Sequence, residues 1–342
     1  MSGFQPVRII GGGLAGLSLG IALRKSGVPT EVLEAGVYPR HRVCGEFITG
    51  LNDATIERLG IGPAFVGAGC HRSMTWFLGG RAVGQQSLPS PARALSRFAL
   101  DARLAELFVA GGGHLSTQTR LKPTHHEPGV VLASGRKTRG SSPWFGLKFH
   151  ARNLTTTDDL ELHLGDGAYV GLSAVEEGWV NVCGLFRRRR GLLFDRDDAL
   201  LVNLRACGMQ SLAERLEIAQ IRPDSRSAVA GLAFDRFVQE DGAVHLGDAC
   251  AMTAPFTGNG MAMAFTSASL AVDPLVAWAS GVQSWDETTR LIHVGLQKEF
   301  RVRLASASFL HPFLLNRTAQ RCLESLIRAG LLPLTALYRL TH

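Results

Sequence analysis

The sequence predicts an α/β fold with two sheets and a helical C-terminal region, and three observations lead to this prediction. A strand, a glycine-rich turn, a helix and a second strand follow one another between residues 7 and 33. Residues 160–185 form short apolar or alternating runs separated by glycine-rich turns, which is typical of an antiparallel sheet. Residues 285–342 carry apolar side chains at helical spacing.

The composition excludes several classes of protein. Hydrophobic residues make up 46% of the 342 residues and charged residues 19%, so a disordered or acidic tail protein is excluded. The net charge of +7 suits anionic ligands or acidic membrane surfaces. Aromatic residues are only 7% and are not interleaved with basic ones, so we expect no nucleic-acid partner. None of the six cysteines forms a C-x-x-C pair, which argues against a zinc ribbon or a dithiol motif.

We expect neither a secretory signal nor a transmembrane helix. Residues 1–6 are short and polar, and Gly11, Gly12 and Gly13 interrupt the apolar run that follows. No stretch of about 18 uninterrupted apolar residues exists. The sequence thus predicts a cytoplasmic protein that is soluble or associates with a membrane peripherally.

The N-terminal segment has the pattern of a dinucleotide-binding unit. Val7–Ile10 is a short apolar strand, and Gly11–Gly16 follows at once as G-x-G-x-x-G. A helical pattern comes next, and a second strand, Thr30–Leu33, ends at Glu34. A plain β-α-β unit without nucleotide is the alternative, but this order of elements favours a Rossmann-like site. The pattern does not distinguish NAD from FAD.

Each residue type in this unit has a physical role. Gly11 permits the tight turn, Gly13 lets the backbone approach a diphosphate, and Gly16 lets the helix pack closely on the strand. The helix N-terminus offers unpaired N–H groups and a partial positive charge to the phosphates. The Glu34 carboxylate accepts hydrogen bonds from ribose hydroxyl groups. The predicted contacts here are Gly11, Gly13, Leu14, Ala15, Gly16, Glu34 and Ala35.

A second glycine-rich turn lies about 230 residues further along the chain. The apolar strand Ala243–Leu246 precedes Asp248, and a helix is expected over about 261–271. Asp248 at a strand end can accept hydrogen bonds from a polyol. Gly258 and Gly260 leave N–H groups open before the helix N-terminus, where they suit the partial negative charge that a reduced isoalloxazine ring develops.

The run GDACAMTAPFTGNGMAMA, residues 247–264, resembles the GD motif of two families. These are the FAD-dependent monooxygenases of the aromatic-hydroxylase type (group A) and the geranylgeranyl reductases. The two motifs occur in the order usual for these flavoproteins, whose FAD-binding domain is discontinuous. The resemblance implies a Rossmann-like, three-layer FAD-binding domain (1–70, 93–140 and 235–280), an inserted antiparallel substrate domain (71–92 and 141–234) and a C-terminal helical region (281–342).

Two further segments carry the resemblance. Arg42–Phe47 is similar to the R-x-C-G segment of geranylgeranyl reductases, which runs beside the flavin. Ser96–Asp101 is similar to the R-x-x-L-D motif, whose arginine, Arg97 here, lies near the ribityl chain and phosphates of FAD. A surface position on a helix is the alternative for Arg97. The further cofactor contacts so implied are Arg42, Cys44, Gly45, Arg97, Leu121, Asp248, Pro255, Gly258, Gly260 and Met261.

Two residues beside the expected ring position are candidates for chemistry. Cys44 is either a thiol that tunes the ring or holds substrate, or a small buried hydrophobic residue, and the second is commoner. Glu46 is a candidate general acid or base, provided that its side chain faces the ring.

The sequence also departs from the resembled families. Ser134 replaces the aspartate that hydroxylases often carry at the end of the strand near 130–132. Gly171 and Ser173 replace aromatic residues of the Y-x-W-x-F-P pattern of geranylgeranyl reductases, which argues against a straightforward prenyl-lipid reductase. In both families the middle sheet roofs the flavin and binds substrate.

Three remaining features have simpler interpretations. His125 and His126 lack further ligands, so we favour a solvated loop and predict no metal. Arg187–Arg190 fits a solvated turn better than an anion or membrane site. The C-terminal helices are expected to pack on the substrate domain, and a hydrophobic tunnel or a peripheral membrane face is the alternative. Their apolar residues are Phe309, Phe313, Leu314, Cys322, Leu323, Ile327, Leu331, Leu332 and Leu334.

Together these observations predict an FAD-dependent oxidoreductase. The resemblance implies a monooxygenase or hydroxylase that acts on an apolar small molecule, aromatic or polyketide-like, with NAD(P)H and O2. A FAD-dependent C=C reductase of an isoprenoid or other lipid is one alternative, and a non-catalytic flavin-binding protein is another. The substrate, the oligomeric state and the choice between NADH and NADPH stay open.

Overall fold

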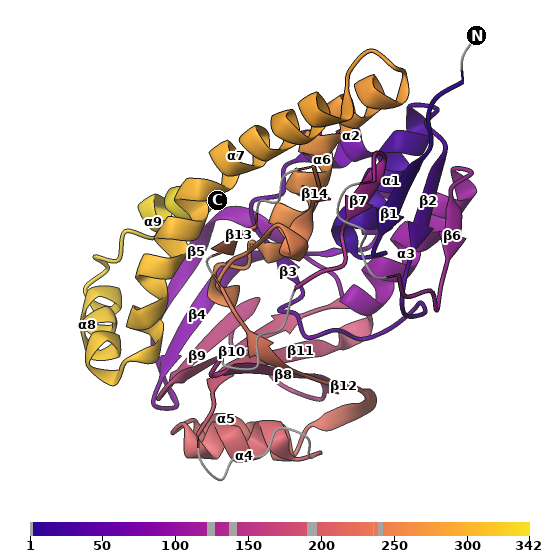
Figure 1. Ribbon diagram of the computed structural model, residues 1–342. Coiled ribbons are helices and arrows are strands. Elements are labelled where there is room, and N and C mark those ends of the chain that lie inside the picture. Colours follow the sequence, from indigo (N-terminus) through magenta and orange to yellow (C-terminus); the bar gives the residue numbers. More distant parts are fainter. Residues whose placement is uncertain (1–2, 122–126, 137–141, 190–196, 235, 239–241) are drawn as a thin grey trace.

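The computed structural model describes residues 3–121, 127–136, 142–189, 197–234, 236–238 and 242–342. Two large sheets, a small two-stranded sheet and the flanking helices make up this part of the chain. The long helix α7 (Trp285–Leu315) runs along the outer edge of the molecule (Figure 1). The predicted combination of a parallel sheet, a second sheet and C-terminal helices is therefore confirmed.

The first sheet consists of five parallel strands in the order β14-β7-β1-β2-β6. Its strands are β1 (Val7–Ile10), β2 (Thr30–Leu33), β6 (His114–Ser116), β7 (Val130–Leu132) and β14 (Val244–His245). The first two have the bounds that their apolar runs predict. Because all the strands are parallel, their carboxyl ends share one edge, where ligands bind in open α/β sheets.

Helices α1 (Leu14–Lys25), α2 (Asp53–Leu59), α3 (Arg97–Ala110) and α6 (Gly260–Ala279) share one apolar core with this sheet. Helix α1 lies against both α3 and α6. The contact with α3 is close because a Cβ atom at Gly20 would lie only 2.7 Å from the ring of Phe108. Small residues on α1 thus let its neighbours approach.

Helix α6 is longer than the sequence predicts. It was expected to end near Ala271 but continues through Pro274 to Ala279. Burial of Leu275 and Trp278 in the core compensates for the backbone hydrogen bond that proline removes. In the part of the chain that the structure describes, α6 alone has the length and hydropathy of a membrane span. Most of its residues are buried against other elements, which accounts for its apolar composition.

The second sheet has eight strands in the order β12-β8-β11-β10-β9-β4-β5-β3. Its strands are β3 (Phe47–Ile48), β4 (Gly69–Leu78), β5 (Arg81–Ala94), β8 (Trp144–Arg152), β9 (Leu160–Gly165), β10 (Ala168–Ala174), β11 (Val180–Arg187) and β12 (Gln220–Leu232). The predicted antiparallel arrangement needs one correction, because β4 pairs with β9 in parallel. That pairing joins segments far apart in the chain, so no turn motif reveals it.

Side chains alternate across the second sheet, as strand geometry requires. Phe145, Leu147 and Phe149 of β8 point to an apolar cluster under α4 (Ala199–Ala206) and α5 (Gln210–Glu217). The intervening residues of β8 therefore face the opposite side, toward the parallel sheet. A small two-stranded sheet pairs β13 (Arg236–Phe237) with β15 (Ala251–Met252).

Three helices complete the chain: α7 (Trp285–Leu315), α8 (Arg317–Arg328) and α9 (Leu334–Thr341). Leu314 and Ile327 pack on the second sheet, as expected for amphipathic helices. However, Phe309, Phe313 and Leu331 are exposed and do not take part in that packing. The spacing of apolar residues predicted the helices correctly but did not separate their buried and exposed faces.

Candidate cofactor and substrate site

A cavity of about 820 Å³ lies between the two sheets and collects residues from both glycine-rich turns. Its volume lies in the range typical of cofactor and small-molecule sites. All the predicted cofactor contacts except Gly16 line it. They are Gly11, Gly13, Leu14, Ala15, Glu34, Ala35, Arg42, Cys44, Gly45, Arg97, Leu121, Asp248, Pro255, Gly258, Gly260 and Met261.

The glycines of the first turn have different structural roles. Gly11 has φ +112°, and a Cβ atom there would meet Ala133 O at 2.3 Å. A Cβ atom at Gly16 would meet Gly11 O at 2.0 Å, so Gly16 supports the turn from behind the cavity. A Cβ atom added at Gly13 would have no neighbour within 4 Å. Gly13 therefore leaves open space beside the N-terminus of α1, where a diphosphate would be stabilised.

Glu34 holds the first turn together. Its Oε2 accepts a hydrogen bond from Gly12 N (2.9 Å), and its Oε1 accepts one from Gly36 N (2.8 Å) and pairs with Arg40 (2.6 Å). Burial alone would raise the pKa of Glu34, but these N–H groups with Arg40 and Arg42 outweigh it and hold the pKa below its usual value. The carboxylate stays charged and can accept further hydrogen bonds.

The second turn lies at the N-terminus of α6. Gly258 has φ +66° and packs against the ring of Phe47, whereas nothing lies within 4 Å of a Cβ atom placed at Gly260. Asp248 lines the cavity, and burial raises the pKa of its carboxyl group. Gly247 lies between α1 and α6, and a Cβ atom added to it would lie only 3.1 Å from the Ala15 methyl group. The two turns therefore open on the same cavity from adjacent helices.

Arginine side chains gather at the end of the cavity that the two glycine-rich turns line. Arg97 makes two hydrogen bonds to Asp101, at 2.7 and 2.8 Å, and Arg42 makes a third to the same carboxylate at 3.1 Å. The Arg97 side chain is only 13% exposed, so the surface alternative for it is wrong. Among the described residues, Arg42 Nη2 and Arg136 Nε have no hydrogen-bond partner. Unpartnered buried guanidinium atoms fit an anionic ligand such as a diphosphate.

The opposite end of the cavity is apolar and carries no charged side chain among its described residues. Tyr169 is positioned there by a hydrogen bond from Phe256 N to its hydroxyl oxygen at 3.1 Å. The lining residues at this end are Leu162, Tyr169, Gly171, Leu185, Val229, Leu232, Met252 and Phe256. A Cβ atom added at Gly171 would lie 3.9 Å from Glu161 O and 4.0 Å from Cys183 O, so the cavity wall is not crowded there.

Cys44 and Glu46 occupy different environments. Cys44 lines the cavity, and burial raises the pKa of its thiol, which keeps it protonated and weakly nucleophilic. The Glu46 side chain does not line the cavity. It lies 3.0 Å from Lys148 Nζ and 2.6 Å from His150 Nε2, and it accepts a hydrogen bond from Arg97 N at 3.0 Å.

The Glu46 cluster joins β8 to the segment that precedes β3 and to the first turn of α3. Lys148 and His150 come from the cavity-facing side of β8, while Glu46 lies in the segment that precedes β3. Burial would raise the pKa of Glu46, but His150, Lys148 and the Arg97 N–H outweigh it and lower the pKa. Glu46 also has φ +58°, a conformation that non-glycine residues seldom adopt. This geometry supports a positioning role for Glu46.

Sequence reasoning missed Lys148 and His150, which lie outside the cavity lining, and several residues that do line it. Lys148 and His150 fit the outward-facing positions of an alternating strand, and only their contacts with Glu46 show that they are buried partners. Arg120 and Arg136 carried a weak signal, since each lies close to a segment assigned to the cofactor site. The main additions to the lining are Arg40, Val43, Phe47, Thr119, Arg120, Ser134, Arg136, Gly146, Tyr169, Cys183 and Phe256.

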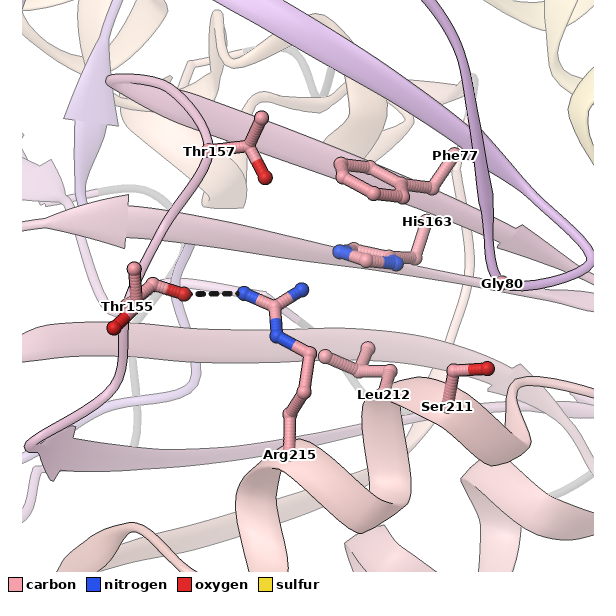
Figure 2. A pocket seen from close by; sticks show the side chains of 8 residues that line it. All are labelled: Phe77, Gly80, Thr155, Thr157, His163, Ser211, Leu212 and Arg215. Carbon is pink, nitrogen blue, oxygen red and sulfur yellow. Dashed lines mark hydrogen bonds between the residues drawn. The ribbon is translucent and has the colours of Figure 1, made fainter.

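A second, smaller cavity of about 330 Å³ lies between the tip of the β4–β5 hairpin, β9 and α5. Figure 2 shows Phe77 and His163 stacked on one side, with Arg215 reaching from α5 toward them. The buried Glu161 lies 2.8 Å from His163 and 3.0 Å from Arg215. These contacts lower the pKa of Glu161 to about 2, although burial alone would raise it.

Some of the residues considered for metal or anion binding are not among those that the structure describes. His125 and His126 lie outside the described residues, as does Arg190 of the basic run. Among the described residues, no group of three or more His, Cys, Asp or Glu side chains could hold a metal ion.

Replacing Lys148 with methionine is expected to destabilise the fold by about 3–5 kcal/mol, because it leaves the Glu46 carboxylate buried without its cation. Urea unfolding of the Lys148→Met variant measures this loss. Arg152→Met, on the same strand but partly exposed, is the matched control and should lose less than about 1 kcal/mol. Equal losses in the two variants would contradict a buried ionic contact.

The pH dependence of stability is expected to have an acid limb that depends on Glu161. Its pKa is lowered from 4.5 to about 2, so its contribution is complete above pH 4.5 and is lost as the pH falls toward 2. At about 1.4 kcal/mol per pKa unit, the contribution is about 3 kcal/mol. Glu161→Gln should flatten this limb in unfolding measurements from pH 7 to pH 2, whereas Glu57→Gln on the surface of α2 should not. An unchanged limb in Glu161→Gln would contradict the assignment.

Comparison with models of protein families gives no match, and comparison with curated protein sequences gives none either. Solved structures do match over nearly the whole chain. HpxO from Klebsiella pneumoniae, solved with FAD and uric acid, has a TM-score of 0.75 at 18% identity. The match covers 98% of this chain and 96% of the HpxO chain. The p-nitrophenol 4-monooxygenase PnpA from Pseudomonas putida DLL-E4 has a TM-score of 0.75 at 13% identity. The match covers 100% of this chain and 97% of the PnpA chain. A triple mutant of the flavin-dependent brominase Bmp2 has a TM-score of 0.71 at 18% identity, and the match covers 97% of each chain. The chain therefore has the fold that these three proteins share, and the resemblance found in the sequence is confirmed at the level of the fold.

Proposed function

We propose that this protein is an FAD-dependent monooxygenase that hydroxylates a neutral, apolar aromatic molecule with NAD(P)H and O2. One observation carries the proposal. A single cavity joins two glycine-rich helix N-termini, at Gly13 and Gly260, to an apolar end without charged side chains among the described residues. The first part suits a long anionic cofactor and the second suits an uncharged substrate beside it.

The residues present fit FAD. Gly13 and Gly260 leave open the space that a Cβ atom would take at each helix end, and neither has a strained φ angle. We assign the diphosphate to Gly11–Ala15 and the arginine side chains, the ribose to Glu34 and the ribityl chain to Asp248. Bound FAD would supply the redox chemistry, taking electrons from NAD(P)H and reacting with O2. The N-terminus of α6 would stabilise negative charge on the ring.

The apolar end determines what the chain itself contributes. Leu162, Leu185 and Leu232 exclude water, and the Tyr169–Phe256 contact fixes the wall against which an aromatic ring would stack. An aromatic carboxylate would be buried there without a cation, which costs several kcal/mol. The substrate we propose is therefore neutral.

Neither catalytic candidate from the sequence is assigned a proton-transfer role. Glu46 already has three donors and lies outside the lining, so we propose that it positions Arg97 and the segment that precedes β3. Cys44 is a protonated neighbour of the flavin in this proposal. The hydrophobic lining and the cofactor, rather than a side-chain acid or base, would control the reaction.

The fold alone does not choose the reaction, since a monooxygenase and a brominase both match it. The deciding experiment measures NAD(P)H oxidation and O2 uptake by the FAD-loaded protein with 2-naphthol, 2-naphthoate and naphthalene as probes. We expect one NAD(P)H and one O2 consumed per molecule hydroxylated, with one oxygen atom of ¹⁸O2 in the product and 2-naphthoate the poorest probe. Reduction of an alkene by the reduced protein without O2 would favour the C=C reductase. Absence of flavin reduction by NAD(P)H would favour a non-catalytic flavin-binding protein.

Replacing Gly13 with valine is expected to abolish FAD binding without unfolding the protein, because the side chain would enter open space beside α1. We expect at least a 100-fold loss of FAD affinity in a fluorescence titration and an unchanged unfolding midpoint. Gly16→Ala is the contrasting variant, since its Cβ atom would collide with Gly11 O and lower stability. Wild-type affinity in Gly13→Val would contradict the assignment of the diphosphate site.

A further inference from the structure

The outer face of α7 carries a stripe of exposed apolar side chains. Five of them are 38–70% exposed, and their spacing, with Lys298 and Ala305 included, is 3, 4, 4, 3, 4 and 4 residues. The stripe consists of Leu291, Val294, Lys298, Val302, Ala305, Phe309 and Phe313. The spacings 3, 4 and 4 add up to an 11-residue repeat, which occurs twice. Eleven residues make close to three full helical turns, so the stripe stays on one face of the helix.

The helix has a separate inner face that already fulfils its packing role. Ile292, Leu296, Phe300 and Leu304 are buried in the core. The outer stripe is therefore not needed to hold α7 in place. It extends for about 33 Å at 1.5 Å per residue, and α7 lies at the edge of the molecule (Figure 1). Phe309 and Phe313 form a contacting aromatic pair at its C-terminal end, with ring centroids 5.7 Å apart.

The free charges in the middle of the stripe are positive, while the exposed Asp286 lies in the first turn of α7, before the stripe begins at Leu291. Lys298 lies within it and Arg301 beside it, both exposed and without an acidic partner among the described ion pairs. The nearby Glu287 and Glu299 are paired with Arg290 and Arg303. Residues 285–342 contain eight Lys or Arg against four Asp or Glu, so this region carries more than half of the net charge of +7.

We propose that this stripe docks on an anionic lipid surface, with α7 lying flat in the interface. An exposed apolar stripe with cationic side chains in and beside it is the pattern of an interfacial amphipathic helix. Anionic lipid head groups attract such cations, and the aromatic pair would enter the boundary between head groups and acyl chains. None of the stripe residues lines the cavity, so binding of the stripe to lipid does not depend on the flavin chemistry.

A second copy of the chain fits the stripe less well. Antiparallel pairing centred on Val302 would bring Lys298 and Arg301 of both copies into the same two turns. Among the described ion pairs, the acidic residue of α7 in that stretch is already paired and cannot compensate them. Like charges facing each other oppose association, whereas an anionic surface neutralises all four.

The test measures binding of the full chain to vesicles by co-sedimentation. The vesicles are phosphatidylcholine alone or phosphatidylcholine with about 30% phosphatidylglycerol, at low and high salt. We expect at least tenfold more binding to the anionic vesicles, with the excess lost in high salt. The double variant Phe309→Ser/Phe313→Ser should lose at least tenfold of this binding, and Lys298→Glu/Arg301→Glu should lose the preference for anionic vesicles.

The matched control is Val66→Ser/Ile218→Ser, which removes two apolar side chains that are at least as exposed but lie elsewhere. It should bind vesicles like the wild type, and all variants should keep the wild-type unfolding midpoint, because the changed side chains are exposed. Wild-type protein that ignores anionic vesicles would overturn the proposal. So would wild-type binding by the Phe309→Ser/Phe313→Ser variant. A dimer in light scattering that this variant dissociates, without vesicle binding, would identify a second copy as the occupant.

Discussion

The structure depends on the close approach of α1 and α6. Gly247 lies between them with φ +59°, and Ala15 and Ala264 are its nearest neighbours. Because these residues are small, the N-termini of both helices reach the same edge of the parallel sheet and open on one cavity. A larger side chain at this contact would separate two partial positive charges that a single extended ligand can use together. The cofactor assignment, the ring position and the substrate position all follow from this contact.

The second constraint is electrostatic and joins β8 to the segment before β3 and to the start of α3. Burying Glu46 with Lys148 and His150 costs desolvation free energy, so the cluster contributes more to a defined arrangement than to stability. It fixes the chain next to Cys44 and Gly45 and the first turn of α3, which carries Arg97. One end of the cavity is consequently cationic and polar, while the other is neutral and apolar. This division separates a cofactor that carries charge from a substrate that does not.

Local patterns predicted much of the fold and of the cofactor end of the site. β1 and β2 have the expected bounds, because the apolar runs and the glycine-rich turn that mark where they begin and end are local features of the sequence. The contacts of the two turns were found because each turn is a continuous motif. Features that depend on distant partners were not predicted. The parallel pairing of β4 with β9, the cluster around Lys148 and the extension of α6 past Pro274 all arise from tertiary packing. The spacing of apolar residues predicted α7 but could not show that Phe309 faces outward.

The central claim is that one ligand is bound by both helix ends at once. Calorimetric titration of flavin-free protein with FAD, ADP and FMN tests it most directly. If the diphosphate and the ring are bound together, one FAD should bind per chain at least about 100-fold more tightly than either ADP or FMN, because linked contacts reinforce each other. FAD that binds no more tightly than ADP would show that only the first turn is used, and would contradict the account.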